Sequence, residues 1–159
     1  MNLPQSVFER AINQPEKIAY HFLNESVSYE QFEQYVATFA GGLKDLGINK
    51  GDHIALLVGN TPHFLITLYA SWRLGAVVVP INPTYTPNEL SYIVQNSDAK
   101  LMVALDKLAP LIAQKNVLFP NIENVIVCET EEDSIKQAME LEEKPYLFTE
   151  LIKSSSPVN

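Results

Sequence analysis

The sequence predicts an α/β fold in which a doubly wound, mainly parallel sheet is flanked by helices and preceded by a small N-terminal β hairpin. First, four apolar runs begin about 24 residues apart, an interval that fits one strand and one crossover helix. Second, the runs are continuously apolar, as in parallel strands that are covered on both faces. Third, helix start signals stand between the runs, where a threonine precedes a proline.

Length and composition agree with this class. Of the 159 residues, 47% are hydrophobic and 19% charged, as in soluble globular domains. The net charge of −8 and the scattered basic residues argue against nucleic acid as a partner, because such binding needs clustered Lys and Arg. The N-terminus shows no signal-peptide pattern, no apolar stretch is long enough for a membrane span, and the single cysteine, Cys128, cannot form an internal disulfide. We therefore expect a cytoplasmic protein without a membrane span.

The chain begins with a predicted helix and the hairpin. Residues 3–13 carry apolar side chains at helical spacing. Residues 18–29 alternate like two short strands that turn at Asn24 and Glu25.

A long helix is expected after the hairpin. Ser28 and Gln31 have the spacing of a capping box, in which the serine accepts from the third helical amide and the glutamine reaches back. Gly47 stands where a left-handed C-terminal cap is expected. Apolar residues recur at every third or fourth position: Phe32, Tyr35, Val36, Phe39, Ala40, Leu43 and Leu46.

Four parallel strands are predicted next, over residues 53–58, 76–81, 100–105 and 124–129. Burial of each Val, Ile or Leu contributes roughly 1.5 to 3 kcal/mol, so four such strands can drive folding. Pro80 suits the end of a strand whose ladder needs no further donor.

The helix after the first of these strands begins with a capping signal. Thr61 precedes Pro62, and the helix is predicted to end at Gly75. Its inward stripe is predicted to consist of Phe64, Leu65, Leu68, Tyr69 and Trp72.

The next helices have similar signals. Thr86, Pro87 and Glu89 form a capping box for a helix that ends near Asn96. Pro110 fits the first turn of a segment after residue 106.

Three loops at the carboxyl ends of the strands are the candidate ligand sites, because open parallel sheets bind ligands at that edge. They are residues 59–62, residues 82–87 and the start of the segment at Asp106. Tyr85 is the aromatic residue whose loop position best suits ligand contact.

Motifs that carry chemistry are missing from the sequence. The glycines never form the G-x-G-x-x-G cradle that brings amides to phosphate oxygens, and Ile48 replaces the lysine in the nearest approach to a Walker sequence. Neither a nucleophile elbow nor a zinc-protease motif occurs. His53 and His63 are candidate general bases, but we interpret them as a strand-start and a helix-surface residue. The acidic run from Glu129 to Glu143 is interpreted as a solvated face rather than a metal site.

Residues 51–104, from GDHIALLVGNTP to DAKLMVA, closely resemble the N-terminal part of acyl-CoA synthetases, which are adenylate-forming (AMP-binding) ligases. VSYEQF at 27–32 and the helix that leads to LGINKGD match the same family. VVVPINPTYTPNEL is most similar to bacterial long-chain fatty-acid CoA ligases, and medium-chain, aryl and succinylbenzoate ligases remain alternatives.

The resemblance implies a ligase of fatty acid metabolism that uses ATP, Mg²⁺ and CoA. The carboxylate and ATP would give an acyl-adenylate and pyrophosphate, and the CoA thiolate would then displace AMP. The family's phosphate loop ending in Pro-Lys-Gly, its adenine, ribose and magnesium motifs and its catalytic lysine would all follow this segment, and none is in the sequence. We therefore expect a truncated N-terminal fragment that is inactive alone, has no catalytic residue and holds no cofactor tightly.

The same resemblance divides the chain and points to one loop. Residues 1–128 are predicted to form the N-terminal α/β subdomain, and residues 129–159 an acidic linker, a short helix and an end that precedes the missing phosphate loop. Some relatives place a basic residue directly after the Asn-Pro of the 82–87 loop, where it reaches toward CoA phosphates. That position is Thr84 here, so the implied CoA-side loop of Asn82, Thr84 and Tyr85 lacks this charge.

Two further expectations concern partners. An exposed sheet edge and apolar surface, which the missing part would cover, favour self-association or a homodimer. The rival interpretation is a free-standing, non-enzymatic doubly wound module that binds a ligand or a partner through the same loops, and it rests on the fold pattern alone.

Overall fold

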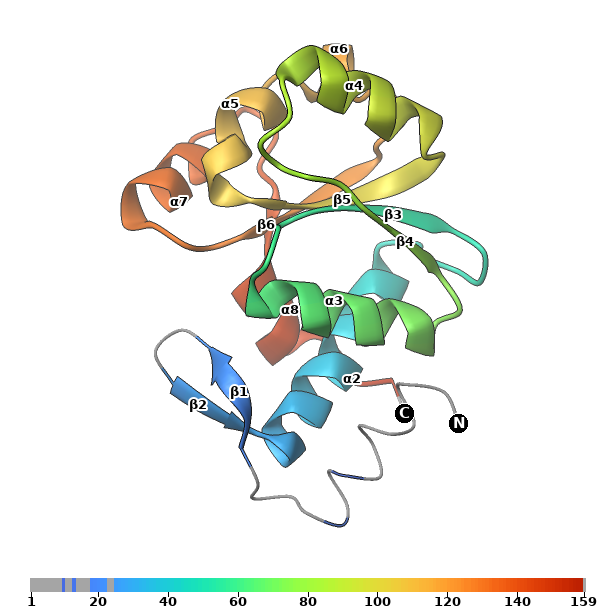
Figure 1. Ribbon diagram of the computed structural model, residues 1–159, viewed down its shortest axis with the longest axis vertical. Coiled ribbons are helices and arrows are strands. Elements are labelled where there is room, and N and C mark those ends of the chain that lie inside the picture. The colour runs from blue at the N-terminus through green and yellow to red at the C-terminus, as the bar shows by residue number, and fades with distance from the viewer. Residues whose placement is uncertain (1–9, 11–12, 14–17, 23–24, 159) are drawn as a thin grey trace.

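The computed structural model describes residue 10, residue 13 and residues 18–22 and 25–158 (Figure 1). Most of the helix predicted over residues 3–13, and Asn24 of the predicted turn, lie outside these residues. The predicted hairpin is confirmed by β1 (Ile18–Phe22) and β2 (Glu25–Ser28), which pair antiparallel.

A second, five-stranded sheet forms the centre of the molecule, and all of its pairs are parallel. In space the order is β4-β3-β5-β6-β7. The four predicted strands are confirmed, whereas β7 was not predicted. The strands are β3 (His53–Leu57), β4 (Val77–Pro80), β5 (Ala99–Leu105), β6 (Asn124–Cys128) and β7 (Tyr146–Leu147).

Helices cover both faces of this sheet, as a doubly wound fold requires (Figure 1). One face carries α2 (Tyr29–Asp45), α3 (Pro62–Arg73) and α8 (Phe148–Ser154). The other carries α4 (Pro87–Asn96), a 3₁₀ turn η1 (Asp106–Leu108), α5 (Ala109–Ile112), α6 (Lys115–Leu118) and α7 (Glu132–Met139). Pro110 lies in the first turn of α5, as predicted.

The inner strands are buried on both faces. In β3, Ile54 and Leu56 belong to the core under α2, α3 and α8, while Ala55 and Leu57 belong to the core under the opposite helices. Such alternation explains why the sequence of these strands is continuously apolar. The prediction that each strand is covered on both faces is wrong for β4, because β4 lies at the sheet edge and Val77 is 44% exposed.

The predicted helix caps are confirmed in part. Ser28 Oγ accepts from the Gln31 amide at 3.1 Å, but Gln31 Nε2 donates to Tyr35 OH at 2.8 Å instead of closing the box. Thr86 Oγ1 accepts from the Glu89 amide at 3.2 Å, as expected. Gly47 has a φ of 92°, which confirms the left-handed cap of α2.

Helix α3 buries a different face from the one predicted. The stripe of Phe64, Leu65, Leu68, Tyr69 and Trp72 is half-buried, and Leu65 is 40% exposed. The buried residues are His63, Ile66, Thr67, Ala70 and Ser71. Small side chains let α3 approach its neighbours closely, so the larger apolar ones flank the contact instead of filling it.

The part after Cys128 packs into the same fold. β7 continues the sheet beside β6, and Phe148 and Ile152 of α8 are buried in the core with α2. Residues 129–159, where one short helix was expected, contain α7, β7 and α8. The division of the chain at residue 128 remains a prediction, but residues 146–152 contribute to the core of the preceding part.

Candidate functional site

The strand order identifies where a ligand crevice is expected. The chain passes from β3 to β4 through α3 on one face and then to β5 through α4 on the other face. In sheets of this order, ligands bind at the carboxyl edge where the winding direction changes, here between β3 and β5.

The loop after β5 is closed by its own hydrogen bonds. Asp106 has no exposed surface, and its carboxylate accepts from Thr130 Oγ1 at 2.6 Å, from Thr130 N at 2.7 Å and from Glu131 N at 2.9 Å. The side chain therefore ties the end of β5 to the loop after β6. The Asp106 carboxylate is thus engaged within the protein, and the neighbouring Lys107 pairs with Glu131 at 3.1 Å.

His63, in the first turn of α3, is buried. The ring is 3% exposed, it packs edge-on against Phe148 at 4.8 Å, and Nδ1 lies 3.2 Å from Thr61 Oγ1. Burial lowers the pKa of His63 to about 4, although the Asp106 carboxylate acts in the opposite direction. The interpretation of His63 as a helix-surface residue is thus wrong, and near pH 7 the ring is neutral.

The loop after β6 is also satisfied internally. The Glu129 carboxylate accepts hydrogen bonds from the Thr149 amide, at 3.1 Å, and from the Thr149 hydroxyl. The Glu129 side chain thus caps the first turn of α8. The loops after β3 and β4 lie at the same edge of the sheet.

A cavity of about 360 Å³ lies between these two loops. Gly59 has a φ of 60°, and a Cβ at this position would lie 3.9 Å from Pro83 Cγ, so the two loops face each other closely. The lining residues are Leu56, Gly59, Asn60, Phe64, Pro80, Ile81, Asn82 and Pro83.

Asn82 organises the loop after β4. Its Oδ1 accepts from the Thr84 amide at 3.0 Å and from Thr84 Oγ1 at 2.7 Å, and its carbonyl accepts from the Tyr85 amide at 3.3 Å. Within the described part of the chain, Asn82 Nδ2 makes no hydrogen bond. Thr84 and Tyr85 are exposed. The three predicted site residues thus share one hydrogen-bonded loop, and of the three Asn82 lines the cavity.

The chemistry of this site is that of binding. No charged side chain is among its described lining residues, which combine apolar rings with the amides of Asn60 and Asn82. Such a lining can hold a partly apolar group and donate to an acceptor, but it cannot transfer a proton. The sequence predicted both loops from their place after apolar strands. Phe64 was missed as a lining residue because its helical position predicts an inward side chain.

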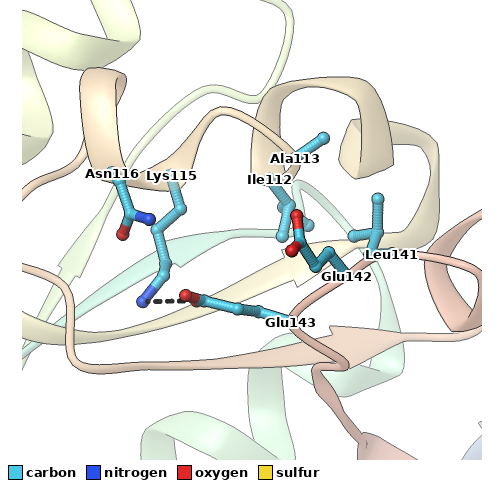
Figure 2. Close-up of a pocket in the computed structure, with 7 residues that line it drawn as sticks. All are labelled: Ile112, Ala113, Lys115, Asn116, Leu141, Glu142 and Glu143. Carbon is cyan, nitrogen blue, oxygen red and sulfur yellow. Dashed lines mark ion pairs between the residues drawn. The ribbon is translucent and has the colours of Figure 1, made fainter.

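A second cavity, of about 390 Å³, lies on the other side of the sheet (Figure 2). It is lined by Ile112, Ala113, Lys115, Asn116, Leu141, Glu142 and Glu143. Lys115 Nζ donates to the Ile122 carbonyl at 3.2 Å and pairs with Glu143 at 3.5 Å. An adjoining hollow extends to the first residues of β6 and β7. The cavity therefore lies toward the amino ends of the strands, away from the edge where such sheets bind ligands.

Among the residues that the structure describes, no three His, Cys, Asp or Glu side chains group closely enough to hold a metal ion. Within the same residues, none of the helices combines the length and apolar character that crossing a membrane requires.

Comparisons with known proteins point to one family. A family model described as "AMP-binding enzyme" matches residues 7–158. The long-chain-fatty-acid–CoA ligases of Yersinia pestis and Haemophilus influenzae are 31% and 29% identical to the chain over 123 residues. Each alignment covers 76% of this chain and 22% of the relative, so the chain spans less than a quarter of the length of these curated relatives.

The fold agrees with a solved structure. The N-terminal domain of FACL13 from Mycobacterium tuberculosis superposes with a TM-score of 0.78 at 27% identity. The match covers 98% of this chain and 36% of that one. The parallel sheet flanked by helices thus corresponds to the N-terminal region of these enzymes.

Proposed function

The chain belongs to the AMP-binding enzyme family, and on that premise we propose that it is the N-terminal part of a fatty-acid–CoA ligase. The observation that carries the proposal is the family match over nearly the whole chain, together with relatives named long-chain-fatty-acid–CoA ligase. The complete enzyme would convert a fatty acid, ATP and CoA to acyl-CoA, AMP and pyrophosphate, in the cytoplasm.

In this proposal, residues 1–159 serve as scaffold rather than as catalyst. The described residues contain neither a metal-binding group nor a charged side chain in the cavity between the β3 and β4 loops. They therefore do not fit ATP with Mg²⁺, and we assign no step of adenylation to them. That chemistry would belong to the phosphate, adenine and lysine motifs that the sequence lacks.

The one ligand contact that we propose for this chain is with CoA, at the loop of Asn82, Thr84 and Tyr85. Support comes from Asn82, which lines the cavity at the carboxyl edge of the sheet and whose Nδ2 has no partner among the described residues, and from the exposure of Tyr85 in the same loop. Because Thr84 brings no positive charge, the contact would depend on hydrogen bonds and stacking, and would respond little to salt.

The activity is tested with this chain and with the longest polypeptide that its gene encodes. Fatty-acid-dependent formation of AMP and acyl-CoA is followed by mass spectrometry. We expect product from the longer polypeptide and none from the 159-residue chain. Fatty-acid-dependent exchange of pyrophosphate into ATP by the chain alone would refute its inactivity, and a longer polypeptide that is inert toward fatty acids of all lengths would refute the ligase proposal.

The CoA loop is tested in the longer polypeptide with Asn82→Ala. This change removes the Nδ2 donor and also the two Oδ1 contacts that hold Thr84. Loss of one neutral hydrogen bond costs about 0.5 to 1.5 kcal/mol, so KM for CoA should rise at least roughly two- to tenfold while KM for ATP stays constant. Asn96→Ala, an exposed change at the end of α4, is the matched control. Equal KM values for CoA in the two variants would remove Asn82 from the proposal.

The rival, a non-enzymatic binding module, makes a different prediction. Saturable binding of a nucleotide or acyl ligand to the 159-residue chain in calorimetry, without activity of any longer polypeptide, would favour it.

A further inference from the structure

Helix α2 contains two adjacent glycines, Gly41 and Gly42, about one turn before its end, and both are buried. Glycine is the poorest helix former after proline, because it loses the most backbone freedom when it becomes helical. A pair of glycines inside an α-helix therefore needs a structural reason.

That reason is the segment after α8, residues 155–158, which crosses α2 at the two glycines. A Cβ at Gly41 would overlap the carbonyl oxygen of Ser156. A Cβ at Gly42 would lie 2.9 Å from Ser155 Oγ and 3.1 Å from Leu151 Cδ2 of α8. A hydroxyl can rotate away, whereas a backbone carbonyl moves only with its whole segment. Gly41 is thus the stricter requirement.

Hydrogen bonds tie the same segment to two helices. The Val158 amide donates to the carbonyl of Ala37 in α2 at 2.9 Å, and Arg73 Nη1 of α3 donates to the Val158 carbonyl at 3.1 Å. The Val158 side chain packs against the core on this face of the sheet. Because both backbone groups of one residue are engaged, the segment has a defined register.

Arg73 is held in place for this contact. Its Nη1 and Nη2 reach the two carboxylate oxygens of Glu33 at 2.7 and 2.8 Å, and the Arg73 side chain is only 9% exposed. A planar guanidinium can make this forked pair and still donate to a third oxygen, which an ammonium group cannot do in the same geometry.

We propose that the groove over Gly41 and Gly42 is a docking site for an extended peptide segment with small side chains, occupied by residues 155–158. Arg73 is its positioning residue and sets the register through Val158. The groove would fix the direction in which the chain leaves α8, and this holds whether or not the ligase proposal is correct.

The test uses Gly41→Ala in the full chain, because docking reverses the sign of the effect that this substitution has on the folding equilibrium constant. At a helix position without a neighbour, alanine would raise the folding equilibrium constant about fivefold. With residues 155–158 in the groove, the constant should instead fall, by about tenfold or more. Gln34→Ala, an exposed change on the same helix, is the control and should change the constant less than about threefold.

Hydrogen exchange gives a second, local measurement. Exchange of the Val158 amide should be about tenfold faster in Gly41→Ala and in Arg73→Met than in the wild type, relative to amides of β5. Arg73→Lys should not restore its protection. A Gly41→Ala variant that is as stable as the wild type or more so, or a wild-type Val158 amide that exchanges like an unstructured peptide, would overturn the proposal.

Discussion

Asp106 joins two strand-end loops through a side chain with no exposed surface. Asp106→Asn keeps the shape but directs an amide NH₂ toward backbone and hydroxyl donors of Thr130 and Glu131. We expect the free energy of unfolding in urea to fall by about 2 to 4 kcal/mol.

The neighbouring Lys107 provides the control for this prediction. It pairs with Glu131 at 3.1 Å, but both side chains are more than half exposed. Lys107→Ala should therefore cost less than about 1 kcal/mol. Similar losses in the two variants would mean that the buried carboxylate contributes no more than a surface ion pair.

His63 should make stability depend on pH. Its pKa is lowered by burial to about 4, from 6.5 in an unfolded chain, so the unfolded state binds the proton more readily. The contribution of His63 is complete above pH 6.5 and is lost as the pH falls toward 4. Between pH 7 and pH 5, this residue should reduce the free energy of unfolding by about 2 kcal/mol.

The measurement is urea unfolding of the wild type and of His63→Gln at both pH values. The glutamine variant should be less stable at pH 7, yet it should lose less stability on acidification. A wild type and variant with parallel pH dependence would show that His63 does not titrate in this range.

Among the elements, α4 offers a clean test of its cap. Thr86 Oγ1 accepts from the Glu89 amide, and the Thr86 hydroxyl lies 3.0 Å from Glu89 Oε1. Thr86→Ala should lower the free energy of unfolding by about 1 kcal/mol, while Thr86→Ser should retain most of it. A serine variant as unstable as the alanine variant would indicate that the methyl group, and not the hydroxyl, matters.

The elements also show how far sequence patterns can be trusted. β3, β5 and β6 were predictable because both of their faces are buried, which favours apolar residues along each strand except near its start, where His53, Lys100 and Asn124 lie. The buried face of α3 could not be predicted, because His63, Thr67 and Ser71 are polar and Ala70 is small. Their burial follows from contacts with elements distant in the sequence. Strand β7 has two residues, which are too few to show a periodic pattern of apolar residues in the sequence.

The candidate site, too, was predictable only in part. Residues 59–62 and 82–87 were predictable, because loops that follow buried parallel strands lie at one edge of the sheet. The sequence did not reveal that Asp106 and Glu129 are fully used by hydrogen bonds to Thr130, Glu131 and Thr149. These partners lie about 20 residues or more away, and nothing local marks them.

For the molecule as a whole, self-association remains a prediction. The amides of Val77 and Ile81 donate to carbonyls beside or within β3. Because successive residues of a strand direct their backbone groups to opposite sides, the backbone of Pro80 faces the open edge, where it has no N–H to donate. Addition of a further strand is therefore opposed there. We expect weak association through exposed apolar side chains, among them Leu65, Val77 and Tyr85.

Sedimentation velocity of the 159-residue chain tests this prediction. The weight-average sedimentation coefficient should rise with protein concentration, and Leu65→Lys should reduce the rise. One sedimenting species with the mass of a monomer at every concentration would contradict it.

The central claim, that the chain is the N-terminal part of a fatty-acid–CoA ligase, is tested most directly by the coding sequence after the Asn159 codon. The account predicts an open reading frame with a loop rich in Ser, Thr and Gly that ends in Pro-Lys-Gly, followed by the remaining motifs of the family. A stop codon directly after Asn159 would contradict the claim and leave the non-enzymatic binding module as the interpretation to pursue.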